Sequence, residues 1–416
     1  MAPLRFGIMG CANIARKNAR AIFLSETCVL VAVASRNLEK AKAFVAEVSY
    51  DGRDAKGGKE SSADVRSYGS YAELLEDAGV DAVYIPLPTT QHLEWVTKAA
   101  KAKKHILIEK PVAVTMEDLD LMIAVCLENQ VILMDGLMFQ HHVRLSRLVS
   151  ELNDPFTGSV SQVHSSFTFR GDDGFLKTNI RTSEQCDPLG ALGDLGWYNI
   201  RISLIAMNAS AFGPDGVLQG SLSLPVKISG VCNVWAGENS RVPIDCRCVL
   251  EWENPRRVAT FDCSFVTAFR QHFEIVCNGS RERGSCDKIF TCSDFVIPTS
   301  PAACSLSLQT IPAGFPGVDN ALRIITQQDT IEIRGCQQEI KMFEAFASLT
   351  HFYAYGTEIS TALKAACRAE SWLQWTRANQ LVMNALMQSM LCGGAVVVLS
   401  PGDMSFSLGP QAKFEP

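Results

Sequence analysis

Apolar and polar positions alternate in two different ways along the chain. In residues 1–137, short apolar runs of strand length are each followed by a stretch in which apolar residues recur at helical spacing. The runs that predict strands are residues 4–10, 29–34, 82–87, 105–108 and 131–137, and the predicted helices are 12–24, 38–48, 71–76, 91–101 and 116–128. Repeated strand–helix units predict an α/β domain with a doubly wound parallel sheet.

Residues 138–416 follow a period of two instead. Apolar and polar residues alternate in 159–169, 226–234, 244–252, 257–265 and 272–277. Such strands, joined by short polar turns, predict an α+β domain with a large, mostly antiparallel open sheet. One face of that sheet should pack on helices, and the other should be covered by a second subunit in a homodimer. We therefore expect two domains, residues 1–137 and 138–416, with an exposed, mobile loop at 50–66.

Composition narrows the class of protein. Hydrophobic residues make up 47% of the 416 positions and charged residues 20%, which is ordinary for a globular chain with two cores. The net charge of −6 and the lack of a basic patch interleaved with aromatic residues argue against nucleic acid as a partner. The start of the chain lacks the features of a signal peptide, and residues 381–399 are too often interrupted to predict a membrane span.

The 15 cysteines are scattered, often within apolar runs, and form no Cys-x-x-Cys pair. They predict buried, reduced thiols in a cytoplasmic protein, and no metal site.

The stretch His105–Pro111, HILIEKP, changes abruptly from apolar to charged residues. Pro111 should end the strand, which places Glu109 and Lys110 at the carboxyl edge of the parallel sheet, where such sheets bind ligands. A lysine that is partly withdrawn from water at such an edge can exchange protons with a substrate. The alternative is a solvated lysine that merely follows a strand.

The turn after the first predicted strand resembles a dinucleotide-binding fingerprint. Gly10 fits its tight turn and Ala15 its close helix–strand packing, but Ala12 replaces the glycine that lets the pyrophosphate approach. The helix amino terminus at Ala12, Asn13 and Ile14 still offers N–H groups to an anion. A tight turn without a ligand is the alternative.

Residues at the ends of two further predicted strands suggest which nucleotide binds. Ser35, Arg36 and Lys40 stand where NAD-binding proteins usually have an acidic residue, so they favour the 2′-phosphate of NADP. Ser35 and Asn37 could instead simply cap the following helix. Pro88, Thr89 and His92 lie at the same edge as Lys110, and His92 is either a neutral ligand-binding histidine or a partly buried one at a helix start.

Within the second domain, Gly190, Gly193 and Gly196 recur at every third position of a predicted helix. Because glycine costs a helix stability, the pattern indicates that something approaches this backbone closely. Asp194 and Tyr198 are four residues apart and share a helix face, where they could hold a hydroxylated substrate and transfer a proton. The alternative is a core tyrosine bound to Asp194. Asn179 and Arg181, in the polar loop before this helix, are further candidates for substrate contact.

Taken together, these motifs resemble the glucose–fructose oxidoreductase, inositol dehydrogenase and rhizopine-catabolism (Gfo/Idh/MocA) family. The chain is most similar to the branch of dimeric dihydrodiol dehydrogenase, NADP-dependent D-xylose dehydrogenase and plant oxidoreductases. The resemblance implies a Rossmann domain and a sheet-rich domain used for dimerisation. The residues implied in catalysis are Lys110, Tyr198, Asp194 and His92, those in substrate binding are Asn179, Arg181, Asp194 and Tyr198, and those in cofactor binding are Gly10, Ala12, Asn13, Ile14, Ser35, Arg36, Lys40, Pro88, Thr89, His92, Glu109 and Lys110.

The resemblance implies an NADP-dependent dehydrogenase acting on a sugar, polyol or cyclic diol. Two other functions occur on this fold: a regulator that binds the dinucleotide without catalysis, and a glycosidase with tightly held NAD. The presence of both Lys110 and Tyr198 disfavours the regulator, and Arg36 disfavours the glycosidase. The chain departs from its relatives at Ala12, at Val143, where proline is common, and in residues 278–334.

Overall fold

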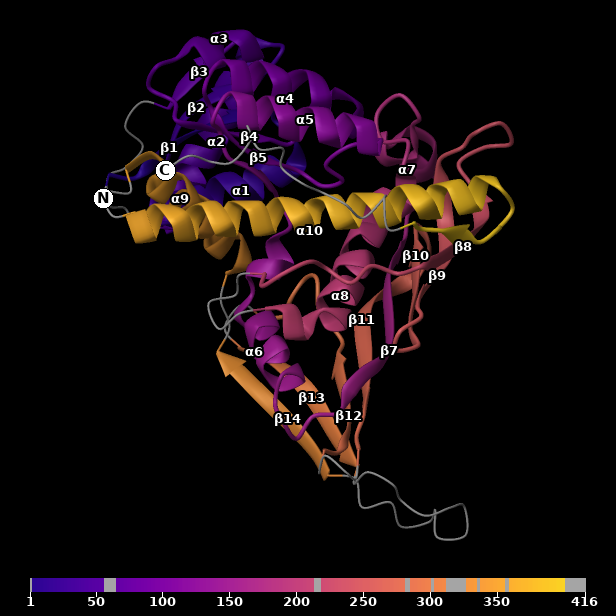
Figure 1. The fold of residues 1–416 in the computed structure, drawn as a ribbon. Helices are drawn as coiled ribbons and strands as arrows, with labels where there is room; N and C mark the ends of the chain where they lie inside the picture. The colour runs from indigo at the N-terminus through magenta and orange to yellow at the C-terminus, as the bar shows by residue number, and fades with distance from the viewer. Residues whose placement is uncertain are drawn as a thin grey trace, which may run out of the picture. The chain divides into compact units, whose positions relative to one another are not determined.

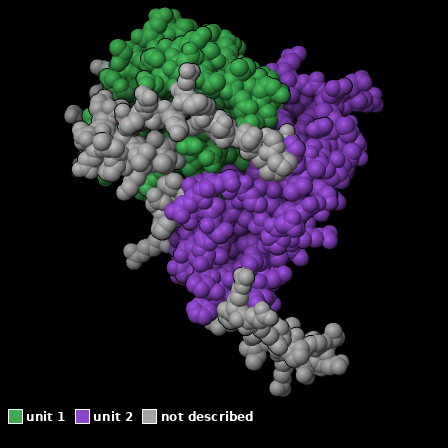
Figure 2. All heavy atoms as spheres, viewed as in Figure 1, with its two compact units in different colours: residues 1–141, 337–380, 406–416 green, residues 142–336, 381–405 purple. Residues whose placement is uncertain are grey.

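The computed structural model describes residues 2–55, 65–212, 218–280, 285–300, 303–311, 327–334, 337–355 and 359–400. The chain divides into two compact units (Figure 2). The first comprises residues 1–141, 337–380 and 406–416, and the second residues 142–336 and 381–405. The return of residues 337–380 to the first unit was not predicted from the sequence. The predicted domain limits, 1–137 and 138–416, remain a proposal about which segments fold independently.

The first unit is built on a six-stranded parallel sheet in the order β3-β2-β1-β4-β5-β6 (Figure 1). Its strands are β1 Leu4–Met9, β2 Cys28–Ala34, β3 Arg66–Tyr68, β4 Ala82–Ile85, β5 His105–Ile108 and β6 Leu133–Asp135. Its helices are α1 Asn13–Leu24, α2 Leu38–Ala55, α3 Tyr71–Glu76, α4 His92–Lys101, α5 Met116–Glu128 and α9 Gln338–Tyr355, with short turns η1 Thr89–Gln91 and η2 Met138–His141. The predicted doubly wound sheet is confirmed.

One local prediction in this unit is wrong. The loop predicted at 50–66 is wrong at both ends, because α2 continues to Ala55 and Arg66 begins β3; residues 56–64 lie outside the described residues. The pattern of paired glycines and charged residues hid both the end of the helix and the short edge strand. The predicted helix at 116–128 is present as α5, and the Thr115 hydroxyl caps it by accepting a hydrogen bond from the Asp118 amide at 3.1 Å.

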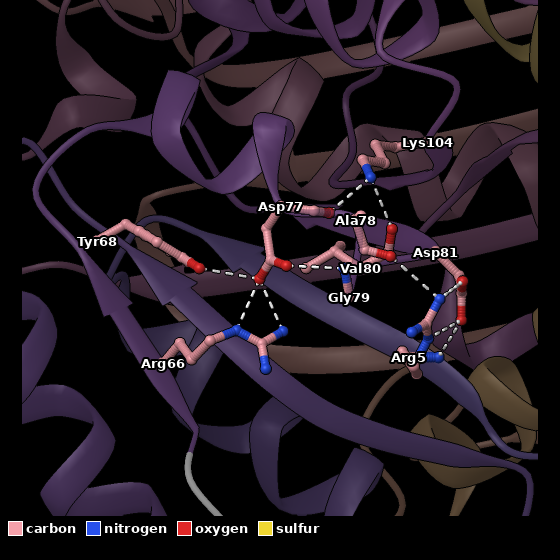
Figure 3. Close-up of polar contacts among 9 residues, drawn as sticks. All are labelled: Arg5, Arg66, Tyr68, Asp77, Ala78, Gly79, Val80, Asp81 and Lys104. Atoms are coloured by element: carbon pink, nitrogen blue, oxygen red, sulfur yellow. Dashed lines mark hydrogen bonds and ion pairs between the residues drawn. The ribbon is translucent and has the colours of Figure 1, made fainter.

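Polar contacts fix the amino edge of this sheet (Figure 3). The Asp77 carboxylate, in the loop before β4, accepts hydrogen bonds from Arg66 Nε at 2.7 Å and from the Tyr68 hydroxyl at 2.9 Å. Lys104 Nζ donates to the carbonyls of Asp77 and Val80, both at 2.8 Å. These contacts join β3 to the segments that precede β4 and β5, at the end of the sheet away from Lys110.

The second unit contains a nine-stranded sheet in the order β14-β13-β12-β11-β7-β10-β9-β8-β15. Its strands are β7 Ser159–Arg170, β8 Lys227–Trp235, β9 Pro243–Trp252, β10 Arg257–Ser264, β11 Val266–Asn278, β12 Asp287–Cys292, β13 Ala303–Ile311, β14 Gln327–Arg334 and β15 Val397–Val398. All pairs are antiparallel except β7 with β10, which run parallel. The predicted mostly antiparallel sheet is confirmed, with this one parallel pair added.

Helices cover the inner face of the second sheet. They are α6 Val143–Leu152, α7 Asp173–Thr178, α8 Trp197–Met207 and the end of α10 Ile359–Leu391, together with short turns η3 Ile180–Thr182 and η5 Ala209–Ala211. Every residue of α8 is buried. Ser389 of α10 accepts a hydrogen bond from the Gly230 amide of β8 at 3.0 Å, which joins that helix to the sheet. Each helix that the structure describes is too short or too polar to cross a bilayer.

Candidate active site

The carboxyl edge of the parallel sheet carries the candidate cofactor site. Strand order reverses between β1 and β4, which is the point where open α/β sheets bind ligands. Gly10, just after β1, has φ of +119°, and a Cβ there would stand 3.0 Å from Leu87 Cδ2 and 3.9 Å from the Pro86 carbonyl. The loops that follow β1 and β4 therefore meet at Gly10, and only glycine fits without strain.

The start of α1 offers backbone amides to an anion. Ala12 is the N-cap of this helix and has no side-chain oxygen to accept from its first N–H groups. The Asn13 side chain accepts from Arg16 instead, at 3.2 Å. By contrast, α3 and α5 are capped by the hydroxyls of Ser70 and Thr115. An uncapped helix start beside a glycine turn fits the pyrophosphate of a dinucleotide.

At the end of β2, the helix cap and the exposed basic residues are different side chains. Asn37, not Ser35, caps α2, because its Oδ1 accepts from the Lys40 amide at 3.1 Å. The Ser35 hydroxyl is buried and accepts from the Asn37 amide at 3.4 Å. Arg36 and Lys40 are exposed, so their charges are available to an external phosphate.

Glu109 joins Lys110 to a buried hydrogen-bond network that the sequence did not reveal. The Tyr84 hydroxyl of β4 donates to Glu109 Oε1 at 2.6 Å and accepts from Asn18 Nδ2 of α1 at the same distance. The other carboxylate oxygen accepts from the Lys110 amide at 3.3 Å. Tyr84 is fully buried and Asn18 nearly so. The network fixes the backbone that carries the Lys110 amine at the carboxyl edge.

His92, at the start of α4, is buried more completely than either alternative from the sequence required. It is 1% exposed. Its Nδ1 lies 2.9 Å from the Val112 carbonyl and its Nε2 lies 2.9 Å from the Leu87 carbonyl. The ring thus joins the loops that follow β4 and β5. Thr89, three residues earlier in the chain, is also buried, and Pro88 is half-buried. A direct catalytic role for His92 stays a prediction.

In the second unit, Asp194 lies in a π-helical turn, Leu192–Gly196, that leads into α8. The prediction of a continuous α-helix here is wrong; π-helical turns are wider and are frequent at functional sites. Arg181 Nε lies 3.0 Å from Asp194 Oδ1, and the Asn179 side chain accepts from the Arg181 amide at 3.1 Å. Three of the predicted substrate residues are therefore brought together.

Tyr198 lies in the first turn of α8 and is 5% exposed. Its ring packs edge-on against Phe167 of β7, with the ring centroids 5.5 Å apart. The predicted glycine pattern is explained by the sheet beneath this helix. A Cβ on Gly190 would stand 2.2 Å from the Pro243 carbonyl of β9, and one on Gly196 would stand 3.3 Å from Cys263 Sγ of β10. The close neighbour of the glycines is thus the protein's own sheet.

Within the described ranges, no group of three or more His, Cys, Asp or Glu side chains is arranged to hold a metal ion. The polar groups that the structure does assemble form two sets, one in each unit. The first surrounds Gly10, Glu109 and Lys110, and it suits a dinucleotide. The second is Asn179, Arg181 and Asp194, followed by Tyr198, and it suits a hydroxylated molecule.

Comparison with known proteins agrees with this division. Residues 4–137 match the family model described as an oxidoreductase family with an NAD-binding Rossmann fold. The chain is 32% identical to dTDP-3,4-didehydro-2,6-dideoxy-α-D-glucose 3-reductase of Actinomadura kijaniata, over 55% of this chain and 63% of that protein. It is 30% identical to D-xylose 1-dehydrogenase (NADP⁺) 2 of Haloferax volcanii, over 58% of this chain and 68% of that protein.

Solved structures show the same fold. The 3-ketoreductase KijD10 of Actinomadura kijaniata, in complex with NADP and TDP-benzene, superimposes with a TM-score of 0.67 at 23% identity. The match covers 93% of this chain and 98% of that one. The family resemblance drawn from the residue motifs is confirmed, and the predicted NADP agrees with the names of these relatives. The chain belongs to the Gfo/Idh/MocA oxidoreductase family.

Proposed function

We propose that this family member is an NADP-dependent dehydrogenase. It transfers hydride between the nicotinamide and a hydroxyl or carbonyl carbon of a sugar, polyol or cyclic trans-diol. The observation that carries the proposal is Lys110, which lies two residues after the end of β5 at the carboxyl edge and whose backbone is tied to the Tyr84–Glu109 network. The relatives named as a dTDP-sugar reductase and an NADP-dependent xylose dehydrogenase support the substrate class.

The residues of the first unit fit the cofactor. Gly10 and the amides at the start of α1 would receive the pyrophosphate, and Ser35, Arg36 and Lys40 would receive the 2′-phosphate. Pro88, Thr89 and His92 would shape the wall beyond Gly10. When bound, NADP supplies or accepts the hydride, and the protein contributes placement and charge.

The second unit would supply the group that transfers the proton. We assign Tyr198 as the group that takes or gives the proton of the substrate hydroxyl. Lys110 would stabilise the oxygen while it carries negative charge and favour the ionised phenol. Asp194, held by Arg181, would accept hydrogen bonds from neighbouring substrate hydroxyls, and Asn179 would orient Arg181. A positioned proton donor of this kind contributes roughly 100-fold to 10,000-fold in rate.

The first prediction tests this assignment with Tyr198→Phe. The variant keeps the ring that packs on Phe167 but loses the phenol oxygen. We expect kcat for D-xylose or trans-dihydrodiols with NADP to fall by about 100-fold or more. NADPH binding, followed by fluorescence titration, should be unchanged. Equal turnover in both proteins would remove Tyr198 from the mechanism, and NADPH binding without turnover of any sugar or diol would support a regulator.

We further propose that the chain works as a cytoplasmic homodimer joined through the outer face of its nine-stranded sheet. This face has two hollows of about 300 and 250 Å³, both lined in part by His164. Val231 of β8 lines the larger hollow and is 50% exposed. A partly apolar, hollowed face of this kind is a surface that a second copy can cover. The thiols that the structure describes are all free, as expected in a reducing compartment.

The second prediction concerns this dimer. Val231→Glu should place a charge in the interface and shift the protein from dimer to monomer in sedimentation experiments at micromolar concentration. Leu121→Glu is the matched control, because Leu121 is 58% exposed on α5 of the other unit. The control should sediment as the wild type does. A dimer that resists the Val231 change, or a wild type that is monomeric, contradicts the proposed interface.

A further inference from the structure

Three cysteines form a row across neighbouring strands of the nine-stranded sheet. Cys232 of β8 lies directly opposite Cys246 of β9, and Cys246 lies directly opposite Cys263 of β10. Directly opposed residues share one face of a sheet. In this case it is the inner face, since Cys246 and Cys263 are both fully buried. Cys232 is only half-buried, so the row begins at a thiol that solvent can reach.

The spacing of opposed strand residues suits a disulfide. Their Cα atoms stand about 4.5 or 5.5 Å apart in an antiparallel pair, depending on the hydrogen-bonding position. Disulfides span Cα separations of about 4.4–6.8 Å. Cys232 and Cys246 are register partners immediately before an irregularity in the β8–β9 pairing, so the spacing of opposed residues applies to them. The Cys232 thiol donates a hydrogen bond to the Val234 carbonyl of its own strand at 3.1 Å.

The two thiols differ in acidity. The hydrogen bond from the Cys246 thiol lowers the pKa of Cys232, and this outweighs the effect of partial burial. The pKa of Cys246 is raised well above its usual value, first by its hydrogen bonds to the Cys232 and Cys263 thiols and then by burial. Thiolates are the nucleophilic form of cysteine. Cys232 is thus the thiol prepared to react first, and Cys246 is a protonated neighbour in contact with it.

We propose that Cys232 and Cys246 form a reversible disulfide site that hydrogen peroxide oxidises. The Cys232 sulfur attacks one peroxide oxygen, so that an S–O bond forms, the O–O bond breaks and water leaves. The Cys246 sulfur then attacks the sulfenic sulfur; the S–S bond forms, the S–O bond breaks, and the Cys246 proton leaves in a second water. Two thiols lose two electrons and two protons, and one peroxide becomes two waters. A dithiol reverses the change by exchange.

Peptide mapping of the full-length protein tests the site. The folded wild type is treated with graded hydrogen peroxide, its remaining thiols are blocked with iodoacetamide, and the digest is analysed by mass spectrometry. We expect a linked peptide containing Cys232 and Cys246 at the lowest effective dose, and its loss after dithiothreitol. Cys392 serves as the internal control, because it is more exposed and lies outside the row. It should still be recovered as the alkylated peptide at that dose.

Two variants make the test decisive. In Cys246→Ala, Cys232 has no resolving thiol, so it should accumulate as sulfenic acid and be trapped by dimedone. Cys392→Ser should leave the linked peptide unchanged. A link between Cys246 and Cys263, or Cys232 that stays reduced or passes to sulfinic acid without a link, overturns the proposal. Because the linked peptide is sought in the wild type, these outcomes are decisive even where Cys246→Ala does not fold.

Discussion

At the scale of single residues, Arg36 is the group that we propose to select NADP over NAD. Its charge acts on Tyr71, where it opposes the stronger effect of burial, which raises the pKa of that phenol. The Tyr71 hydroxyl in turn lies 3.8 Å from the Cβ position of Gly10. Arg36 therefore lies beside the nucleotide turn, with no acidic residue at the end of β2 to repel a phosphate.

The third prediction follows from this placement. Arg36→Ala should weaken NADPH binding by about 10-fold to 100-fold, the amount expected for a lost charge-assisted hydrogen bond of about 1.5–3 kcal/mol. NADH binding should stay the same, and the loss should shrink as salt is added. Arg20→Ala, at an exposed position of α1, is the matched control. Fluorescence titration gives the dissociation constants, and an equal loss for both cofactors would mean that Arg36 does not contact the 2′-phosphate.

The residues that could be predicted are those whose chemistry contrasts with their surroundings. Gly10 in a turn, Lys110 after an apolar run and Asp194 in a glycine-rich stretch all stand out locally. Tyr84 does not, because a tyrosine in an apolar strand looks like any core residue. Its partner Glu109 is brought to it only by the pairing of β4 with β5, in which Tyr84 lies opposite Leu107. Such a contact depends on strand register, which local patterns do not contain.

At the scale of elements, the amino edge of the parallel sheet depends on the Asp77 carboxylate. Its side chain is 13% exposed and is bound by Arg66 and Tyr68 of β3 and by the Gly79 amide. Burial alone would raise the pKa of Asp77, but these hydrogen bonds together lower it. The loop before β4 is therefore held to the edge strand by an ionised group that is largely shielded from water.

The fourth prediction is that Asp77→Asn lowers the free energy of unfolding by about 2 kcal/mol, since it removes charge-assisted hydrogen bonds. The midpoint of urea unfolding should fall accordingly. Asp173→Asn provides the control, because Asp173 is 92% exposed and its ion pair with Lys177 is long, at 3.6 Å. Its midpoint should match the wild type. A similar shift in both variants would mean that the Asp77 contacts carry no special weight.

Most elements of the first sheet follow from the residue pattern, and the exceptions have physical reasons. β3 is three residues long and begins with Arg66, so it has too few apolar positions to show an alternation. The glycines of Leu192–Gly196 mark the segment as unusual, but their spacing is compatible with an α-helix, so the pattern did not predict a π-helical turn. The parallel pairing of β7 with β10 joins segments far apart in sequence, which alternation alone does not order.

At the scale of the whole molecule, the carboxyl-terminal segments complete the first unit. Phe343 and Phe346 of α9 pack on Phe6 of β1, with ring centroids 5.1 and 5.6 Å away. The sequence pattern of α9 does not show which sheet this helix packs on. Because this contact joins positions more than 300 residues apart in the chain, the sequence pattern of residues 1–137 alone looks like a finished domain.

Burial of His105 makes the folding stability of the protein depend on pH in mild acid. Burial lowers the pKa of His105 to about 4, with Asp81 opposing and His351 adding to the shift. Its Nδ1 accepts a hydrogen bond from the Ile132 amide at 3.1 Å, so the folded protein holds the neutral ring. In the unfolded chain the ring takes up a proton below about pH 6.5, whereas in the folded protein it does not until about pH 4. The contribution of His105 to folding stability is therefore fully present above about pH 6.5 and is lost as the pH falls from about 6.5 to about 4.

The fifth prediction separates this histidine from the carboxylates. Asp77 and Asp81 have lowered pKa values, so the stability that they provide is lost only below about pH 4, the range in which carboxyls of the unfolded chain become protonated. The wild type should thus lose about 2 kcal/mol from His105 by about pH 5, at roughly 1.4 kcal/mol per pKa unit. His105→Asn keeps an acceptor for the Ile132 amide but does not titrate, so its unfolding free energy should fall less over the same range. Urea unfolding at several pH values measures both slopes, and parallel slopes would show that protonation of His105 is not what destabilises the protein in mild acid.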